Sequence, residues 1–407
     1  MTPRATPRRI SILGSTGSIG VSTLRLLEET GGREAYEIEA LIGGRNVELL
    51  AEQALRWRPA LTVLADEAQA QALRERLDGS GLPWACGEAA AVEAAGRKAD
   101  WIMAAIVGMA GLRPTWAAAA TGAALALANK ESLVGCGRAL IERVEAHGGV
   151  VLPVDSEHNA IFQVFNADHK RQVSRLILTA SGGPFRGFTR EQLSGVTPEQ
   201  ALRHPNWSMG AKITVDSASL ANKGLEFIEA AYLFDMPGEK IDVVVHPQSV
   251  VHSLVEYGDG STLAQLGPPD MRVPIASCLA WPQRIGWDAP KLDLTARGRL
   301  DFAAPDPEAF PMLPLARRAL AAGEGMPVVY NAANEVCVQA FLERKIGFLD
   351  IPEYVETAMM RAQLPSISSN ARAGHATSDA IMERALALDG EVRRLVRGLF
   401  ADARRRA

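Results

Sequence analysis

Arg9-Ile-Ser-Ile-Leu-Gly14-Ser-Thr-Gly17-Ser-Ile-Gly20, near the start of the chain, is the stretch that decides the fold class. A short apolar strand, a glycine-rich turn and the beginning of a helix follow one another here. Glycines let the backbone approach a pyrophosphate, and the first amides of the helix point at its charge. The spacing is G-x-x-G-x-x-G rather than G-x-G-x-x-G, and the alternative is a tight turn without a ligand. We interpret the segment as the start of a dinucleotide-binding domain.

The pattern that follows this turn supports the interpretation as far as about residue 155. Strands are expected at Ile10–Leu13, Tyr36–Ile42, Leu61–Leu64, Trp101–Ile106, Ala123–Ala128 and Val150–Val154. Helical patterns lie between them, at Ile19–Glu29, Val47–Trp57, Glu67–Leu77 and Ser132–Ala146. Alternation of this kind predicts an α/β fold, in which a Rossmann-like N-terminal domain has a parallel sheet with helices on both faces.

Beyond residue 155 the pattern is different. Strands are expected at Leu176–Ala180 and Ile241–Val245, and a hairpin at Val250–Tyr257 with Ser261–Leu266. The stretch 181–210 is rich in glycine, proline and aromatic residues, which is typical of an ordered but mobile loop region. Four helical patterns follow a proline-rich stretch, at Leu315–Ala321, Asn334–Lys345, Pro352–Arg361 and Ser378–Phe400. We therefore expect a cofactor-binding domain (1–155), an α/β catalytic domain (156–280), a linker (281–314) and a C-terminal helical domain (315–407).

Composition narrows the classes of partner. The 407 residues include 43 Lys and Arg against 47 Asp and Glu, a net charge of −4. Nucleic acids and anionic membranes are not expected as partners, because binding to them relies on a basic excess. The longest apolar run, Trp101–Leu112, is too short to span a bilayer. The four cysteines show no C-x-x-C spacing, which is typical of a reducing compartment, and we expect a cytoplasmic protein.

The residues after the second strand bear on the choice of cofactor. They are Gly43-Gly44-Arg45-Asn46, where an NAD-binding chain usually carries Asp or Glu for the ribose hydroxyls. Arg45 can instead pair with a 2′-phosphate, which favours NADP. The alternative is an ordinary arginine at the surface.

Two later strands end in polar residues. Asn129-Lys130-Glu131-Ser132 follows the fifth strand and Asp155-Ser156-Glu157-His158 the sixth, at the sheet edge where α/β folds bind ligands. Residues two apart in an extended segment face the same way, so Asp155 and Glu157 are expected to point two carboxylates at one place. Paired hard oxygens suit Mg²⁺ or Mn²⁺. An acidic strand end facing solvent is the alternative, and Lys130 at a neighbouring strand end favours a site.

A third carboxylate is expected on a helix that begins near Asp216 or Ser217. Asn222, Lys223 and Glu226 share one face of it by their spacing of three and four residues. Glu229 extends this polar stripe and competes with Glu226 as a metal ligand, and a solvated stripe is the alternative for the whole face.

Other side chains suit the far end of a substrate. Ser181 and Ser217 can donate hydrogen bonds to a phosphate, with Lys223 as its counter-charge. Trp207 and Met209, in His204-Pro-Asn-Trp-Ser-Met-Gly210, can form an apolar lid that excludes water. A loop held in place by a buried Trp207 is the alternative. His246 and His252 are more often structural than catalytic at such positions.

These motifs, in this order, resemble those of the 1-deoxy-D-xylulose 5-phosphate reductoisomerase family. Further shared stretches are Ala-Ser-Gly-Gly-Pro-Phe, Asn-Lys-Gly-Leu-Glu, His-Pro-Gln-Ser, Pro-Asp-Met-Arg and, near residue 331, Asn-Ala-Ala-Asn-Glu. The resemblance covers nearly the whole chain. It implies a homodimeric enzyme with an N-terminal NADPH domain, a catalytic domain and a helical domain. Such an enzyme uses NADPH and Mg²⁺ or Mn²⁺ to convert the sugar phosphate 1-deoxy-D-xylulose 5-phosphate to 2-C-methyl-D-erythritol 4-phosphate in non-mevalonate isoprenoid biosynthesis.

The resemblance also implies roles residue by residue. The metal ligands are Asp155, Glu157 and Glu226, with Glu226 preferred to Glu229, and Lys130 joins them as a catalytic residue. The substrate-binding set is Lys130, Ser156, Glu157, Ser181, His204, Trp207, Met209, Ser217, Asn222, Lys223 and Glu226. The cofactor-binding set is Thr16, Gly17, Ser18, Ile19, Gly44, Arg45, Asn46, Asn129, Glu131 and Gly210.

Two other functions compete with this one. A metal-dependent sugar-phosphate isomerase or aldolase with a vestigial nucleotide fold would turn over substrate without consuming NADPH. A non-enzymatic NADP-binding regulator would have no need for three convergent carboxylates.

Overall fold

The structure is a computed structural model that describes residues 6–207, 209–323, 325–364 and 378–406. Its contacts divide the chain into two compact units. Unit 1 contains residues 1–132, 138–159 and 270–290, and unit 2 contains residues 133–137, 160–269 and 291–407. The four-part division expected from the sequence stays a prediction.

Unit 1 is built on a seven-stranded parallel sheet with the order β4-β3-β2-β1-β5-β6-β7. The strands are β1 (Arg8–Leu13), β2 (Tyr36–Gly43), β3 (Leu61–Leu64), β4 (Trp84–Cys86), β5 (Trp101–Ala104), β6 (Ala124–Leu127) and β7 (Val150–Pro153). The chain builds outward from β1 to β4 and then returns to the other side of β1. That reversal is the switch point beside which open α/β sheets bind their ligands, and it confirms the Rossmann-like fold.

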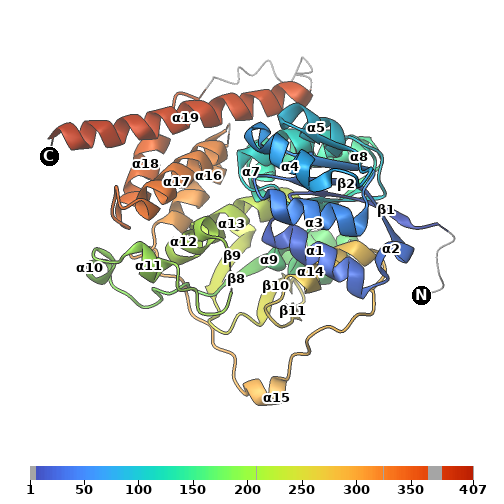
Figure 1. Cartoon of the computed structure of the whole chain (residues 1–407). Helices are drawn as coiled ribbons and strands as arrows, with labels where there is room; N and C mark the ends of the chain where they lie inside the picture. Colours follow the sequence, from blue (N-terminus) through green and yellow to red (C-terminus); the bar gives the residue numbers. More distant parts are fainter. Residues whose placement is uncertain (1–5, 208, 324, 365–377, 407) are drawn as a thin grey trace, which may run out of the picture. The chain divides into compact units, whose positions relative to one another are not determined.

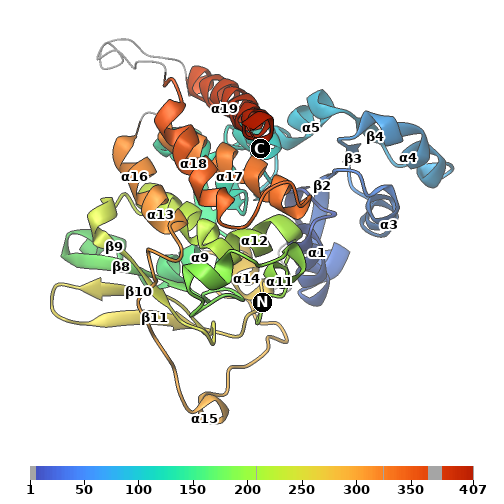
Figure 2. The same cartoon turned by 90° about the vertical axis from the view of Figure 1, so that its left-hand side faces the viewer.

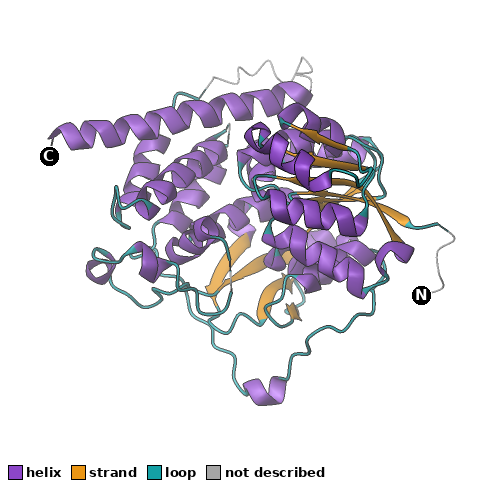
Figure 3. Cartoon of the chain, viewed as in Figure 1, coloured by secondary structure: helices purple, strands orange, loops and turns teal. Residues whose placement is uncertain are grey.

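Helices cover both faces of this sheet, whose strands are orange in Figure 3. They are α1 (Ser18–Glu29), α2 (Gly32–Ala35), α3 (Val47–Trp57), α4 (Ala70–Leu77), α5 (Glu88–Ala95), α6 (Leu112–Ala118), α8 (Arg138–Ala146) and α14 (Arg272–Ala280). Helices α7 (Lys130–Cys136) and α9 (Ser156–Val164) begin in unit 1 and end in unit 2. Short 3₁₀ turns occur at Glu67–Gln69 and Met109–Gly111. The apolar strands are fully buried, as Ile12 and Trp101 illustrate at 0% exposure. This burial explains why short apolar runs predicted six of the seven strands, all except the half-buried β4.

Unit 2 contains a four-stranded mixed sheet with the order β11-β10-β8-β9. Its strands are β8 (Val173–Ala180), β9 (Ile241–Val245), β10 (Val251–Tyr257) and β11 (Thr262–Leu266). β10 and β11 form the expected antiparallel hairpin, and β8 pairs with β9 in parallel. Figure 2 shows this hairpin in yellow beside β8. Helix α13 (Ala221–Leu233) packs against β8 and β9.

The C-terminal helices of unit 2 form a layered bundle. They are α16 (Met312–Ala322), α17 (Met326–Leu342), α18 (Asp350–Arg361) and α19 (Ser378–Arg406). In Figure 1 the long red α19 runs alongside the orange α17 and α18, and both helices contact it. The four helical patterns expected from the sequence are confirmed, and α17 begins at Met326, eight residues earlier than Asn334, because Pro327, Val328, Val329 and Tyr330 continue its buried face.

Several local expectations differ from the structure. The helix expected over Ser132–Ala146 is two helices, α7 and α8, separated at Gly137, which has φ 54°. The helix expected to begin near Asp216 is also two helices, because α12 (Ala211–Ser219) ends at Leu220 in a left-handed conformation and α13 begins at Ala221. The stretch 181–210 contains α10 (Arg190–Leu193) and α11 (Pro198–Ala201), each with a threonine capping box.

The remaining elements are brief. Unit 2 has 3₁₀ turns at Ala167–Gln172 and Gly238–Lys240, and the short helix α15 (Leu294–Arg297). Val245 and Ala303 form an isolated antiparallel bridge. Among the described residues, no helix combines the length and the apolar character needed to cross a lipid bilayer.

Candidate active site

The glycine-rich turn follows β1 and leads directly into α1. Gly14 has φ 91°, and a Cβ there would lie 2.5 Å from the carbonyl oxygen of Ala105. A Cβ on Gly20 would lie 2.4 Å from the carbonyl oxygen of Gly14. Gly17 caps α1 without a side-chain hydrogen bond. The turn therefore requires glycine for close packing, and the amides at the start of α1 carry no side-chain cap, which suits an anion.

The residues after β2 differ in how firmly the fold holds their side chains. A Cβ on Gly44 would meet no heavy atom within 4 Å. The Asn46 side chain accepts a hydrogen bond from the Leu49 amide (3.1 Å) and caps α3. The Arg45 side chain is 89% exposed, and its Nε lies 3.3 Å from Asp66 Oδ2. Arg45 is thus weakly held at the surface and can turn towards a ligand.

Asn129, after β6, joins the loop after β5 to the start of α7. Its Nδ2 donates to the Gly108 carbonyl (3.0 Å) and to Glu131 Oε2 (3.2 Å), and its Oδ1 accepts from the Ser132 amide (2.8 Å). Asn129 and Glu131 are buried, at 1% and 5% exposure. Asn129 therefore supports the backbone of the loop after β5, beside the switch point, a structural role that sequence reasoning missed.

Lys130 and Asp155 meet between neighbouring strand ends. Lys130 Nζ donates to Asp155 Oδ2 at 2.6 Å, and the lysine is 8% exposed. Two strand ends that are far apart in the sequence thus bring a cation and an acid together, as expected from their places at the end of β6 and β7.

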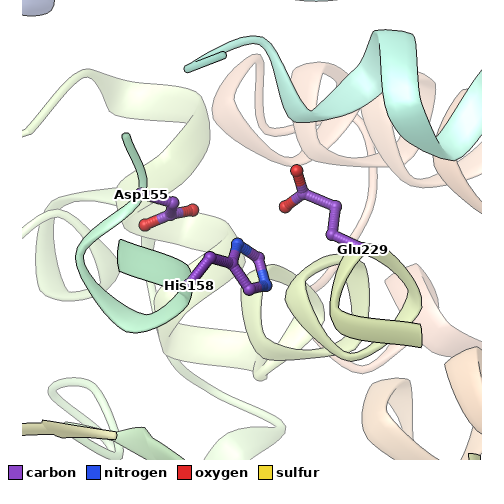
Figure 4. Close-up of side chains that lie close together, drawn as sticks. All are labelled: Asp155, His158 and Glu229. Atoms are coloured by element: carbon purple, nitrogen blue, oxygen red, sulfur yellow. The ribbon is translucent and has the colours of Figure 1, made fainter. Parts of the chain in front are cut away.

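The expected extended geometry of Asp155 and Glu157 is wrong. The Asn159 amide donates to the Asp155 carbonyl (2.8 Å), so helix α9 starts here and Glu157 lies in its first turn. Ser156 Oγ donates to Glu157 Oε2 (2.5 Å). The two carboxylates converge all the same, because an oxygen of Asp155 and an oxygen of Glu157 lie within 4.8 Å of each other across the start of the helix. His158, drawn with Asp155 in Figure 4, is buried at 1% exposure.

Glu226 lies on α13 with the two neighbours expected from its spacing. Asn222 Nδ2 and Lys223 Nζ both donate to its carboxylate, one to each oxygen. Glu226 is 0% and Lys223 4% exposed. A buried carboxylate needs such partners, because an unpaired charge is costly away from water. Glu229, one turn later on α13 and also drawn in Figure 4, is 3% exposed.

Ser181 and His204 form a defined hydrogen-bonded pair in unit 2. His204 Nδ1 accepts from the amides of Asn206 (3.2 Å) and Trp207 (3.0 Å), so the ring proton is on Nε2. Nε2 therefore donates to Ser181 Oγ (3.0 Å), which also accepts from the Gly183 amide (3.1 Å). Burial lowers the pKa of His204, which favours this neutral form. Since the hydroxyl accepts twice, its own proton is directed to another acceptor.

The loop that follows Ser181 lies close to the backbone of α12 at Ser217. Gly183 has φ 63°, and a Cβ there would lie 2.9 Å from the Ser217 carbonyl oxygen. Gly183 thus allows this loop to lie directly on α12. Ser181, bonded to His204, therefore lies two residues before a glycine that contacts the backbone of Ser217, while Asn222 and Lys223 lie at the start of α13.

The loop that carries Trp207 and Met209 is fixed through Asn206, a residue that the sequence analysis did not select. Asn206 Nδ2 donates to the Pro247 carbonyl (2.6 Å) and to Ser249 Oγ (3.0 Å). The rings of Trp207 and His252 lie 6.3 Å apart. Trp207 and Met209 are half-buried. The Gly210 carbonyl accepts from Thr214 Oγ1 (2.8 Å) at the start of α12.

Known proteins resemble this chain over its whole length. Three family models match, with descriptions of 1-deoxy-D-xylulose 5-phosphate reductoisomerase (residues 10–137), its C-terminal domain (151–234) and the DXP reductoisomerase C-terminal domain (266–395). The reductoisomerase of Caulobacter vibrioides is 57% identical over 98% of both chains, and that of Rhodospirillum centenum is 57% identical over 93% of both.

Solved structures agree. The reductoisomerase from Zymomonas mobilis in complex with NADPH matches with a TM-score of 0.88 and 48% identity, over 97% of this chain and 99% of that one. A reductoisomerase in complex with NADPH, fosmidomycin and magnesium matches with a TM-score of 0.89 and 41% identity, over 97% and 98%. The fold, the switch-point residues and these likenesses agree, and the chain belongs to the 1-deoxy-D-xylulose 5-phosphate reductoisomerase family.

Proposed function

We propose that this chain catalyses the NADPH-dependent rearrangement and reduction of 1-deoxy-D-xylulose 5-phosphate to 2-C-methyl-D-erythritol 4-phosphate. The observation that carries the proposal is the 57% identity over 98% of the chain with a reductoisomerase. A redox-free isomerase or aldolase is not favoured, because solved relatives are complexes with NADPH. The regulator is disfavoured by the buried acids and cations described above.

Asp155, Glu157 and Glu226 are the proposed metal ligands. The proposal is supported by the chemistry of three carboxylates and by the convergence of Asp155 and Glu157, which place an oxygen each within 4.8 Å of the other. Hard carboxylate oxygens fit Mg²⁺ or Mn²⁺, and a relative contains magnesium. The rival set is Asp155, His158 and Glu229, drawn in Figure 4, but its imidazole nitrogen suits Mg²⁺ less well than a third carboxylate.

A bound divalent ion supplies Lewis-acid stabilisation of negative charge on substrate oxygens. The chain's own contribution next to the ion is Lys130, whose ammonium group lies 2.6 Å from Asp155. We propose that Lys130 orients Asp155 and stabilises charge that develops on the substrate, while Ser156 and Glu157 contact the substrate beside it. Because Lys130 is nearly buried, its field is weakly screened.

The phosphate end of the substrate is assigned to unit 2. Ser181 directs its hydroxyl proton outward because its oxygen already accepts two hydrogen bonds. Ser217, Asn222, Lys223 and His204 complete the proposed phosphate-binding set. Trp207 and Met209 belong to the loop that we propose covers the substrate and excludes water.

NADPH is assigned mainly to unit 1. The uncapped first turn of α1 supports a pyrophosphate site formed by Thr16, Gly17, Ser18 and Ile19. The exposed Arg45, flanked by Gly44 and Asn46, is proposed to pair with the 2′-phosphate. Asn129 and Glu131 at the switch point, and Gly210 before α12, complete the proposed cofactor set.

We also propose that two copies form a homodimer through β11. Among the strands of the described residues, β11 pairs with β10 alone, so its other edge is open to a further strand. Leu263 on β11 is 48% exposed, which suits burial against a second copy. A cytoplasmic location stays a prediction.

The experiment that tests the proposed function follows NADPH oxidation in the presence of 1-deoxy-D-xylulose 5-phosphate and Mg²⁺ or Mn²⁺. We expect oxidation that requires both the substrate and the metal, and that stops when EDTA is added. Lack of NADPH oxidation with every metal tested would contradict the proposal.

A further inference from the structure

Helix α17 makes a fully buried polar contact with α12. Asn334 Nδ2 donates to Asp216 Oδ1 at 2.8 Å, and the two residues are 0% and 1% exposed. The other oxygen of Asp216 lies 2.9 Å from Lys212 Nζ, one turn earlier on α12. A hydrogen bond to a buried carboxylate is among the strong ones, so this contact fixes α12 firmly against α17.

A second residue of α17 holds the start of α13. The Tyr330 hydroxyl, one turn before Asn334, lies 3.4 Å from the Ala221 carbonyl and 3.2 Å from the Met312 carbonyl. Burial, together with the charge of Asp216, raises the pKa of Tyr330 well above its ordinary value, so the hydroxyl keeps its proton. A Cβ on Gly224 would lie 2.5 Å from the Tyr330 oxygen, which shows how closely α13 lies on this side chain.

These contacts flank the proposed phosphate-binding residues. Asp216 directly precedes Ser217, and Ala221 directly precedes Asn222. Between them Leu220 is buried and has φ 62°, a conformation that costs free energy for a residue with a side chain. The surroundings must hold this turn in place, and α17 supplies polar contacts on both sides of it.

Stability alone does not account for Asn334. Its Oδ1 is buried and has no hydrogen-bond partner among the residues that the structure describes. An unsatisfied buried oxygen lowers the free energy of unfolding, and an apolar side chain of similar size would avoid that cost. What Asn334 offers is a donor aimed at Asp216.

We propose that Asn334 is a positioning residue for the phosphate end of the substrate, acting through Asp216 on the Ser217 hydroxyl. The inference rests on the proposed function, which assigns Ser217 to the phosphate. Loss of the amide lets the end of α12 shift, so the loss falls on phosphate binding rather than on NADPH.

The test compares Asn334→Ala with Asn331→Ala. Asn331 is a matched control, because it is 1% exposed on the same helix and its amide donates within α17 to Glu335 Oε1 (3.1 Å). We expect Asn334→Ala to raise KM for the substrate and the inhibition constant of inorganic phosphate by about tenfold, a difference of about 1.4 kcal/mol. The Kd for NADPH should stay unchanged, and Asn331→Ala should change neither phosphate constant. A lower Tm with unchanged phosphate constants for Asn334→Ala would overturn the inference.

Exchanging the two side chains between positions 216 and 334 distinguishes loss of the contact from loss of folding. Asp216→Asn combined with Asn334→Asp keeps one amide and one carboxylate, and the new amide at position 216 can still offer its oxygen to Lys212. Recovery of phosphate inhibition to within about twofold of the wild type supports the inference. A loss as large as that of Asn334→Ala in this folded variant would overturn it.

Ser217→Ala distinguishes a failed assignment of Ser217 to the phosphate from a failed role of Asn334. Unchanged phosphate inhibition in this variant means that the assignment of Ser217 to the phosphate fails, and the inference with it. Weakened inhibition in Ser217→Ala, with normal inhibition in Asn334→Ala, means that the assignment holds and the inference fails. If Asn334 acts through Ser217, the variant that combines Ser217→Ala with Asn334→Ala should bind inorganic phosphate no more weakly than Ser217→Ala alone.

Discussion

Replacing Glu226 with glutamine tests both the ion pair on α13 and the proposed metal site. The substitution removes the negative charge that faces Lys223, whose side chain is 4% exposed. Removing one partner of a buried ion pair costs about 3 to 5 kcal/mol, because the buried cation loses this counter-charge. A glutamine oxygen still accepts one hydrogen bond, so we expect the lower end of that range, about 3 kcal/mol. Urea unfolding in the presence of EDTA measures this loss.

Repeating the unfolding measurement with Mg²⁺ distinguishes a loss of stability from the loss of a metal ligand. An ion that binds only the folded protein raises the free energy of unfolding by about 2.7 kcal/mol at 100 times its Kd. We expect the wild type and Glu229→Gln to show this increment, and Glu226→Gln to show little of it and little turnover. Glu229→Gln is the matched control, since Glu229 lies one turn later on α13 and is also buried. An increment that persists in Glu226→Gln and disappears in Glu229→Gln would refute the assignment in favour of the rival ligand set.

Three further predictions use other parts of the chain. Arg45→Asp should lower the ratio of kcat/KM with NADPH to that with NADH by tenfold or more, whereas Arg56→Asp, at another exposed ion pair, should leave it unchanged. An unchanged ratio in Arg45→Asp would remove Arg45 from the cofactor site. Burial lowers the pKa of His204, so its neutral form contributes stability fully above about pH 6.5 and loses it as the pH falls towards the lowered value. His204→Gln should therefore flatten the acid side of a Tm-against-pH curve, and an unaltered slope would contradict the assigned tautomer. Leu263→Asp on β11 should halve the mass of the particle in solution, while Leu202→Asp, also at an exposed leucine of unit 2, should not; a dimer that survives Leu263→Asp places the interface elsewhere.

The sequence predicted the regular elements well where burial is strong and local. Helix α3 and strands β3 and β9 have the ends that their apolar patterns indicate. Strand β4 was missed because its three residues, Trp84–Cys86, are too few to show a period. The break at Leu220 was missed because a left-handed leucine has no local signal and depends on packing from a distant helix.

The candidate site was predictable in its composition more than in its geometry. Strand-end residues such as Lys130 and Asp155 meet because parallel strands end at one edge, which sequence order reveals. The orientation of Glu157 was not predictable, because it depends on α9 starting at Ser156. The contact between Asn334 and Asp216 joins residues 118 positions apart, and no periodic pattern reports such a pairing. The repeated asparagines near residue 331 were the one available signal.

The most direct test of the central claim measures substrate and cofactor together. Purified protein is mixed with 1-deoxy-D-xylulose 5-phosphate, NADPH and Mg²⁺, and the NADPH consumed is compared with the sugar phosphate converted. We predict one NADPH oxidised for each 2-C-methyl-D-erythritol 4-phosphate formed, with no conversion in EDTA. Conversion of the sugar phosphate without NADPH consumption would contradict the reductoisomerase assignment and favour an isomerase or aldolase.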